Sequence, residues 1–197
     1  MVNQSDLATN GESPVTYALG TYSNAASPGT WTNVTSNDTS GNLVSGKGYQ
    51  MATDGGTRLD FTGTVVNSNT PVSITSPASG TKWNLVANPF PSYVNGNSNA
   101  GTNNFFSTNS GVLHDSFTAV YGWDADGSGY TVYNAANTWY IAPGQGFFVA
   151  SANASGSSVS FNLNMRTITG TGSFVQDSVQ DEVEIGLYNG DSRLDYT

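Results

Sequence analysis

The chain has 197 residues and a formal net charge of −9; 10% of its residues are charged and 12% are aromatic. Its five lysines and arginines are too few to cluster along a phosphate backbone or an anionic lipid surface. Composition therefore argues against nucleic acid as a partner. The absence of cysteine excludes a disulfide framework, a thiol nucleophile and a thiolate metal site. No apolar run reaches the roughly 18 residues of a membrane-spanning helix, so we expect no membrane insertion.

The pattern of apolar residues predicts a chain made of strands. Alternation of apolar with polar residues predicts strands near residues 15–19, 31–34, 49–52, 59–65, 72–74, 83–88, 117–123, 130–133, 145–150, 159–165 and 183–187. No segment of about ten residues or more has the 3.6-residue period of a helix. About ten strands separated by turns are typical of an antiparallel β-sandwich, jelly-roll or immunoglobulin-like, without substantial helix.

Two apolar strands beside proline turns form the centre of this predicted sandwich. Residues 82–93, K-W-N-L-V-A-N-P-F-P-S-Y, alternate as far as Asn88, after which two prolines remove ladder donors and end the pairing. Residues 139–150, W-Y-I-A-P-G-Q-G-F-F-V-A, place a Pro-Gly turn before an apolar strand. The alternation assigns Trp83 and Trp123 to core faces, so we expect both side chains to be buried.

The chain divides into three expected parts. Residues 1–12 are polar and are expected to be disordered or a linker remnant, whereas residues 13–170 form the sandwich module. Within the module, residues 95–111 are the longest irregular stretch and are expected to be a loop. Residues 171–197 are expected to be a linker and the first strand of a following domain. A hairpin turn is predicted at residues 189–191, with its return strand cut off by the end of the chain.

Six motifs follow one another along the chain: G-K-G-Y (46–49), L-D-F-T-G-T (59–64), K-W-N-L-V-A-N-P-F-P-S (82–92), Y-G-W-D (121–124), Y-I-A-P-G-Q-G-F-F-V (140–149) and F-N-L-N-M-R (161–166). In this order they resemble a β-rich module found near the C-termini of secreted or surface proteins of Bacteroidetes-type bacteria, where it precedes a sorting domain of the type IX secretion system. The resemblance spans about residues 31–197, and it departs from the family's usual G-N-P at residues 87–89. It implies export to the cell surface or the extracellular space and contact with neighbouring domains of the parent protein. It supplies no catalytic residue.

The segment D-A-D-G-S-G at 124–129 has the residue types of a calcium loop. Asp124, Asp126 and Ser128 place oxygens at loop positions 1, 3 and 5, and a glycine stands at position 6. The glutamate of position 12 is replaced by Ala135, and Asp and Gly are also the residues that a hairpin turn prefers. The turn is the favoured interpretation. The alternative is a weak Ca²⁺ site, and no cofactor is required.

The sequence supports no catalytic constellation, so we expect a protein that is not an enzyme. His114, Asp115 and Ser116 are triad residue types, but adjacent residues of an extended chain point to opposite faces and cannot form a relay. Glycoside hydrolysis needs two carboxylates that face each other across a cleft. Most of the aspartates instead lie at predicted turns, where aspartate is common.

Aromatic residues beside turns are the best candidates for a ligand site. Trp31, Tyr93, Trp139 and Tyr140 lie near turns amid Asn and Thr, where ring faces could stack on sugars and amides could bind hydroxyl groups. Trp139 is the first choice because it follows the polar run 134–138. Packing of these rings beneath loops is an equally weighted alternative.

Two functions of different classes are consistent with these observations. The favoured one is a non-catalytic extracellular module that binds a polysaccharide or surface glycan, or promotes adhesion. The alternative is a structural spacer that supports the sorting domain and has no ligand of its own. An exposed coplanar pair of aromatic rings in a groove would support the first function, and burial of all four tryptophans would support the second.

Overall fold

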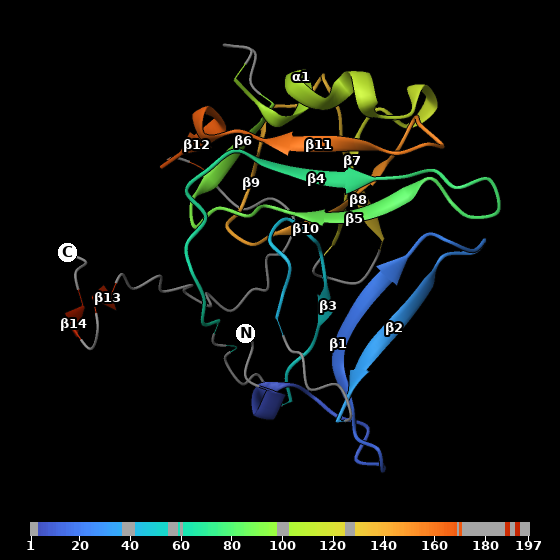
Figure 1. Cartoon of the computed structure of the whole chain (residues 1–197). Helices are drawn as coiled ribbons and strands as arrows, with labels where there is room; N and C mark the ends of the chain where they lie inside the picture. Colours follow the sequence, from blue (N-terminus) through green and yellow to red (C-terminus); the bar gives the residue numbers. More distant parts are fainter. Residues whose placement is uncertain are drawn as a thin grey trace.

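A computed structural model of the chain describes residues 4–36, 42–54, 59, 61–97, 103–124, 129–168 and 170, and the backbone of residues 188–189 and 192–193. In these residues the protein consists of antiparallel sheets, one short α-helix and a few 3-10 turns (Figure 1). This arrangement confirms the predicted all-β, sandwich-like class. None of the described helices has the length and apolar character needed to cross a membrane.

The described residues form fourteen short strands, one α-helix and four 3-10 turns. The strands are β1 (Thr16–Ser23), β2 (Thr30–Thr35), β3 (Gln50–Met51), β4 (Thr70–Ile74), β5 (Trp83–Ala87), β6 (Tyr93–Asn97), β7 (Val120–Trp123), β8 (Tyr130–Tyr133), β9 (Trp139–Ile141), β10 (Gly146–Ala150), β11 (Ser157–Phe161), β12 (Arg166–Thr167), β13 (Tyr188–Asn189) and β14 (Ser192–Arg193). The helices are α1 (Phe105–Asn109) and the 3-10 turns η1 (Gln4–Asp6), η2 (Ser110–Val112), η3 (Asp115–Phe117) and η4 (Leu163–Met165).

The main body is built around a four-stranded sheet in the order β5–β10–β7–β8. In this sheet Phe148 of β10 stands opposite Leu85 of β5 and Tyr121 of β7. The small sheets β11–β4 and β12–β6–β9 complete the body, and α1 contacts β6 and β11 at the top of Figure 1. Because side chains alternate across each strand, one face of the four-stranded sheet points into the body and the other points outward.

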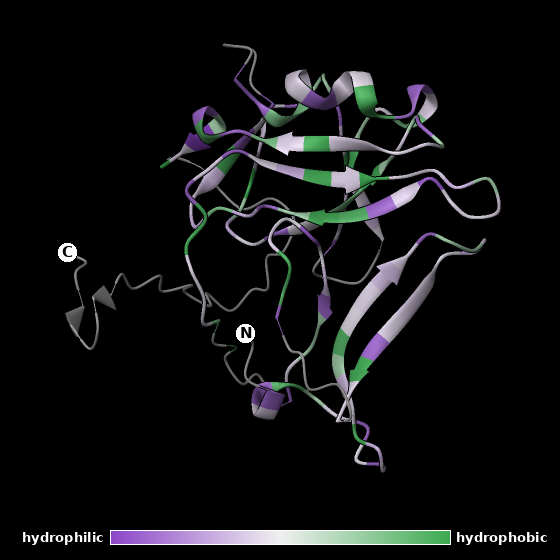
Figure 2. Ribbon diagram, in the orientation of Figure 1, coloured by the Kyte–Doolittle hydropathy of each residue, from purple (hydrophilic) through white to green (hydrophobic). Residues whose placement is uncertain are grey.

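One hydrophobic core joins these layers. It consists of Ile74, Val86, Phe90, Val94, Phe105, Phe106, Leu113, Val120, Trp139, Ile141, Phe147, Val149, Val159, Phe161 and Met165. Figure 2 shows the matching hydrophobic segments on β4, β5 and β11, whereas the hairpin of β1 and β2 is mostly pale. Burial of these side chains supplies the main driving force for folding, since the chain has few charges to pair.

Asn88 connects the two proline-turn motifs that the sequence singled out. Its side chain is 3% exposed, and its Nδ2 donates to the carbonyl oxygens of Ser92, Ile141 and Ala142 at 2.9, 3.3 and 3.0 Å. Its Oδ1 accepts a hydrogen bond from the N–H of Phe90 at 3.0 Å. A single buried amide therefore satisfies backbone groups in both turns.

A second, smaller cluster lies beside the sheet β2–β1–β3, and it includes the N-terminal residues. Leu7 is 3% exposed and packs with Leu19, while the N–H of Ala8 donates to the carbonyl of Ala52 at 2.9 Å. The expectation that residues 1–12 are disordered or a linker remnant is therefore wrong for residues 4–12, because Leu7 gains burial that a polar linker could not provide. The outer boundaries of the module stay a prediction.

Residues 95–97 and 103–111, the described part of the stretch 95–111, are not the irregular loop that we expected. β6 continues to Asn97, and α1 buries Phe105 and Phe106, which are 0% and 8% exposed. The Oδ1 of Asn104 caps the helix by accepting the N–H of Ser107 at 2.7 Å. A helix of five residues is too short to show a 3.6-residue period in the sequence.

The strand predicted at residues 59–65 is also wrong in the described part of that range. Phe61 and Val65 are 61% and 53% exposed, and residues 61–65 lie in no strand. Phe61 forms a single β-bridge and residues 62–65 belong to no strand, so alternation alone does not make this stretch a strand. The strand predicted at 159–165 ends at Phe161, after which η4 begins.

The C-terminal residues were expected to contain an unpaired strand. Residues 183–187 lie outside the described residues. β13 pairs with β14, with Tyr188 opposite Arg193, so the return strand that we expected to be cut off is present.

Candidate functional site

The structure separates the four predicted ligand residues. Trp31 lies on β2 and is 41% exposed. Tyr93 and Tyr140 are half-buried on the paired strands β6 and β9. Trp139 is 1% exposed, so its predicted role as the main stacking residue is wrong. The four rings therefore do not form one site.

Trp139 is buried because β6 leaves room for it. A Cβ at Gly96 would collide with the indole ring, and the ring centroid lies 5.8 Å from that of Tyr133. The glycine therefore allows the indole to lie directly against the backbone of β6 in the core. Proximity to a turn in sequence did not indicate exposure here.

Trp123 and Trp83 were predicted to be buried, and both are more exposed than predicted. Trp123 is 53% exposed, and Trp83 is only half-buried. Alternation along a strand shows that a residue shares a face with its neighbours, but it does not show which face the rest of the chain covers. Here the covered face carries Val86, Phe147 and Val149, and both tryptophans lie on the other one.

Five rings gather on the outward side of the four-stranded sheet, and we call them the aromatic face: Tyr22, Trp31, Trp123, Tyr130 and Phe148. Phe148 is their centre, with ring centroids 4.9 Å from Tyr22, 5.9 Å from Tyr130 and 6.3 Å from Trp31. Trp123 extends the group through Tyr130 at 4.9 Å. Trp31, Trp123 and Tyr130 are 41%, 53% and 49% exposed. Two hairpins and β10 thus contribute to one surface.

The rings of the aromatic face meet edge to face. Their interplanar angles range from 65° to 87°, so the contacts hold the rings rigidly in a favoured geometry but create no flat platform. A sugar ring could stack on one indole at a time, and the two exposed tryptophans offer the largest free faces.

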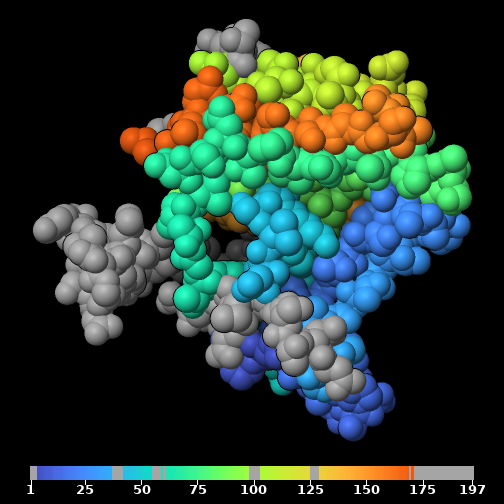
Figure 3. Space-filling model, in the orientation of Figure 1, coloured from blue at the N-terminus to red at the C-terminus, as the bar shows by residue number. Residues whose placement is uncertain are grey.

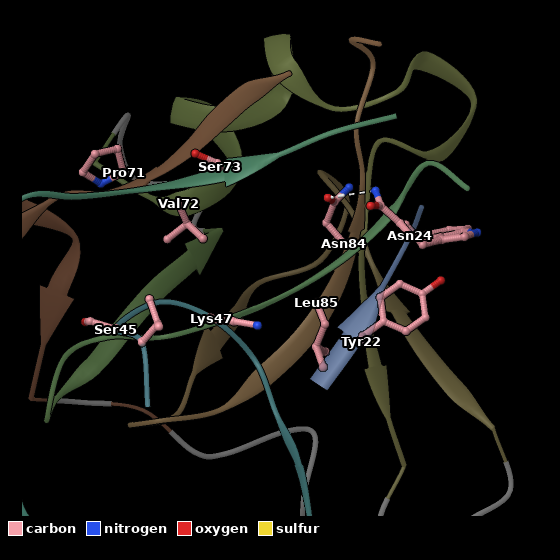
Figure 4. Close-up of a pocket in the computed structure, with 11 residues that line it drawn as sticks. Tyr22, Asn24, Ser45, Lys47, Pro71, Val72, Ser73, Asn84 and Leu85 are labelled. Carbon is pink, nitrogen blue, oxygen red and sulfur yellow. Dashed lines mark hydrogen bonds between the residues drawn. The ribbon is translucent and has the colours of Figure 1, made fainter. Parts of the chain in front are cut away.

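Two hollows flank Trp83, next to the aromatic face. The first, about 370 Å³, is lined by Tyr22, Asn24, Val44, Ser45, Lys47, Pro71, Val72, Ser73, Trp83, Asn84 and Leu85 (Figure 4). The second, about 460 Å³, is lined by Ser27, Ser76, Pro77, Ala78, Gly80, Thr81, Lys82, Trp83 and Phe117. Both volumes fall in the range of small-ligand sites, about 300–1,000 Å³.

The β1–β2 hairpin is held against the loop before β5, between the two hollows. The N–H of Thr81 donates to the carbonyl of Asn24 at 2.9 Å, and the Nδ2 of Asn24 donates to Asn84 Oδ1 at 3.3 Å, as drawn in Figure 4. In Figure 3 the blue hairpin meets the green loop at this point. These amides bind one another and the backbone, so the walls of the hollows are preformed.

Two phenol groups on the outward side titrate above their ordinary value. Burial raises the pKa of Tyr121 above 10.0. Burial is also the larger cause of the raised pKa of Tyr130, and the charge of nearby Tyr22 adds to it. Both phenols therefore keep their protons at neutral pH and can donate hydrogen bonds.

These raised pKa values predict a loss of stability in alkaline solution. A folded-state pKa above the unfolded value gives stability that is fully present below pH 10 and is lost as the pH rises through the folded pKa. Urea unfolding of the parent should thus show a falling midpoint above pH 10, and Tyr130→Phe should fall less steeply. Equal slopes for parent and variant would contradict the assignment to Tyr130.

The predicted calcium loop is only partly described. Asp126 and Ser128 lie outside the described residues, and the Oδ1 of Asp124 accepts a hydrogen bond from the Thr131 hydroxyl. Where the structure describes the chain, no three acidic or histidine side chains come together as a metal site. His114 has a local role, because its Nδ1 accepts the N–H of Ser116 at the start of η3. The calcium site stays a prediction.

We compared the chain with models of protein families, with curated proteins and with solved structures, and none of them matches it.

Proposed function

We propose that the chain is a non-catalytic extracellular module of a multidomain secreted or cell-surface protein, and that it binds glycan through its aromatic face. The observation that carries the proposal is the exposure of Trp31, Trp123 and Tyr130 on one connected surface. The resemblance to modules that precede type IX sorting domains supports the extracellular location and the presence of neighbouring domains.

Exposed indoles suit a saccharide because one sugar face is apolar C–H and its edge is polar hydroxyl. An indole meets the C–H face, and the phenol of Tyr130 can donate to a hydroxyl. Stacking on each ring contributes on the order of 1 kcal/mol beyond area burial. Two stacked rings would give a weak site, with dissociation constants in the micromolar to millimolar range.

The alternative function is a spacer whose aromatic face packs against a neighbouring domain. Val132 favours it, because this aliphatic side chain is 46% exposed on β8 beside Tyr121 of β7 and offers nothing specific to a sugar. Exposed apolar patches of this kind mark interfaces with proteins as well as ligand sites. The edge-to-face rings favour glycan because their hydroxyl groups and indole faces lie at the surface together.

Affinity electrophoresis and calorimetry with neutral and acidic polysaccharides test the proposal. We expect Trp123→Ala to weaken binding at least about fivefold, the loss that corresponds to roughly 1 kcal/mol. Trp31→Ala should have a similar effect. Phe61→Ala is the matched control, because it removes an aromatic ring of 61% exposure that makes no contact with the aromatic face in the described residues.

Equal losses for Phe61→Ala and Trp123→Ala would show that the aromatic face is not the site. If no polysaccharide binds, the glycan proposal is wrong. The spacer function then predicts that Trp123→Ala lowers the stability of a longer protein containing the next domain, while changing that of this chain little.

A further inference from the structure

The chain is strongly acidic, yet each hollow beside Trp83 contains a lysine. Lys47 lines the first hollow and Lys82 lines the second, and Trp83 lines both. The whole chain has only five lysines and arginines against fourteen acids. Among the residues that the structure describes, no aspartate or glutamate lines either hollow.

The position of Lys47 is fixed by the G-K-G motif. Gly46 has a φ of +80°, and a Cβ at Gly48 would lie 3.0 Å from the carbonyl oxygen of Val86. The glycines therefore allow this segment to lie against β5, where the N–H of Ala87 donates to Gly46 at 2.8 Å. Lys47 is thus half-buried at the wall of the first hollow, not free on a loop.

The ammonium group of Lys82 lies over an aromatic ring beside the second hollow. Its Nζ lies 4.9 Å from the ring centroid of Phe117, and Phe117 in turn contacts Trp83 with ring centroids 5.4 Å apart. The Nζ of Lys47 lies 5.5 Å from the ring of Tyr49. Within the described part of the chain, neither ammonium group forms an ion pair with an acid.

We propose that the two hollows bind an acidic saccharide, whose carboxylate or sulfate groups meet the ammonium groups of Lys47 and Lys82 on either side of Trp83. This inference rests on the proposed glycan-binding function and specifies its ligand class. An ammonium group that has no carboxylate partner in the described residues can form a charge-assisted hydrogen bond with an anionic group of a ligand. Trp83 lines both hollows, so its indole ring can contact a saccharide in either of them.

The net charge of −9 does not prevent such binding. At physiological ionic strength charges farther apart than about 8 Å are largely screened, so the acids elsewhere on the chain chiefly slow the encounter. Two cations also differ from the dense cluster that nucleic acid needs. The salt dependence should be shallow, with a slope of log K against log salt no steeper than about −2 for two contacts.

Matched pairs of polymers test the inference. We would measure binding of the full chain to polygalacturonate and its methyl ester, and to dextran sulfate and dextran. Each pair keeps the sugar backbone and removes the charge, and the two pairs distinguish carboxylate from sulfate. We expect at least one charged polymer to bind about fivefold or more tighter than its neutral partner, with a shallow salt slope.

Lys47→Met and Lys82→Met should each remove most of that preference, whereas Arg166→Met should change affinity less than twofold. Arg166 is the matched control because it is exposed and its guanidinium lies over Phe90, away from both hollows. Equal binding of charged and neutral polymers, or an equal effect of Arg166→Met, would overturn the inference.

The outcomes also separate this inference from the proposed function. If neutral polymers bind as tightly as charged ones and Trp123→Ala weakens that binding, the glycan-binding function is supported and the acidic ligand class is wrong. If charged polymers bind, and the lysine variants weaken this binding while Trp123→Ala does not, the hollows are supported as the site and the aromatic face is not the site. Binding of none of these polymers to the folded chain would overturn both.

Discussion

Replacing Trp139 by alanine should destabilise the fold by roughly 3–5 kcal/mol, the cost of truncating a fully buried aromatic side chain. The indole is 1% exposed and fills the space above Gly96 in the core. Its loss leaves a cavity that the short strand β9, paired to β6, cannot close without breaking its register. Urea unfolding followed by circular dichroism measures the change. A domain of this size has only about 5–15 kcal/mol in total, so the midpoint should fall markedly.

Trp123→Ala is the control, since it removes the same side chain from a position that is 53% exposed. We expect it to cost less than about 1 kcal/mol. Equal urea midpoints for the two variants would contradict the assignment of Trp139 as buried and Trp123 as exposed.

Asn88→Ala should cost about 3 kcal/mol although it removes only a small polar group. Three carbonyl oxygens and the N–H of Phe90 lose their partner at a residue that is 3% exposed. Each buried group left without a partner costs about 1–3 kcal/mol, and water entering near the turns offsets part of the total. Urea unfolding again gives the value.

Two further variants identify which atoms of Asn88 matter. Asn88→Asp keeps the acceptor for Phe90 but replaces the donating amide by a carboxylate that repels three carbonyl oxygens. It should therefore be no more stable than Asn88→Ala. Asn164→Ala is the control, because among the described residues this exposed amide makes one side-chain hydrogen bond, to Asn103, and its loss should cost at most about 0.5 kcal/mol. Parent-like stability of Asn88→Asp would show that the donated hydrogen bonds contribute little.

The strand pattern was largely predictable because alternation and turn residues act locally. β5, β7, β8 and β10 lie where the apolar alternation predicts strands, and the prolines after Asn88 end β5 as expected. The errors have one physical source. In its described part the alternation at 59–65 gives a single β-bridge at Phe61 and no strand, and the Asn-rich stretch 95–111 contains a helix whose burial depends on β6 and β11.

The site was less predictable, because exposure depends on residues far away in the sequence. Trp31, one of the four candidate ligand residues, is 41% exposed, while its role in binding stays a prediction. Trp123 was missed because its alternation resembles that of a core residue. Lys47 lies within the G-K-G-Y motif, where the glycines on both sides of it are the one local signal of close packing.

By itself the sequence determined the β class and the positions of most turns, because backbone preferences of Pro, Gly and Asn and the two-residue period of a strand are local properties. Only the tertiary structure decided which side of each strand is covered. Trp139 is buried because Gly96 lies beneath it. Trp123 is exposed because the β1–β2 hairpin packs on Phe148 of the same sheet face, whereas Trp123 itself stays 53% exposed. The side chains of Asn88 and Asn109 bind backbone groups that are distant in sequence, which no local pattern indicated. Burial is a property of the assembled layers, so it depends on contacts between residues that are distant in the chain.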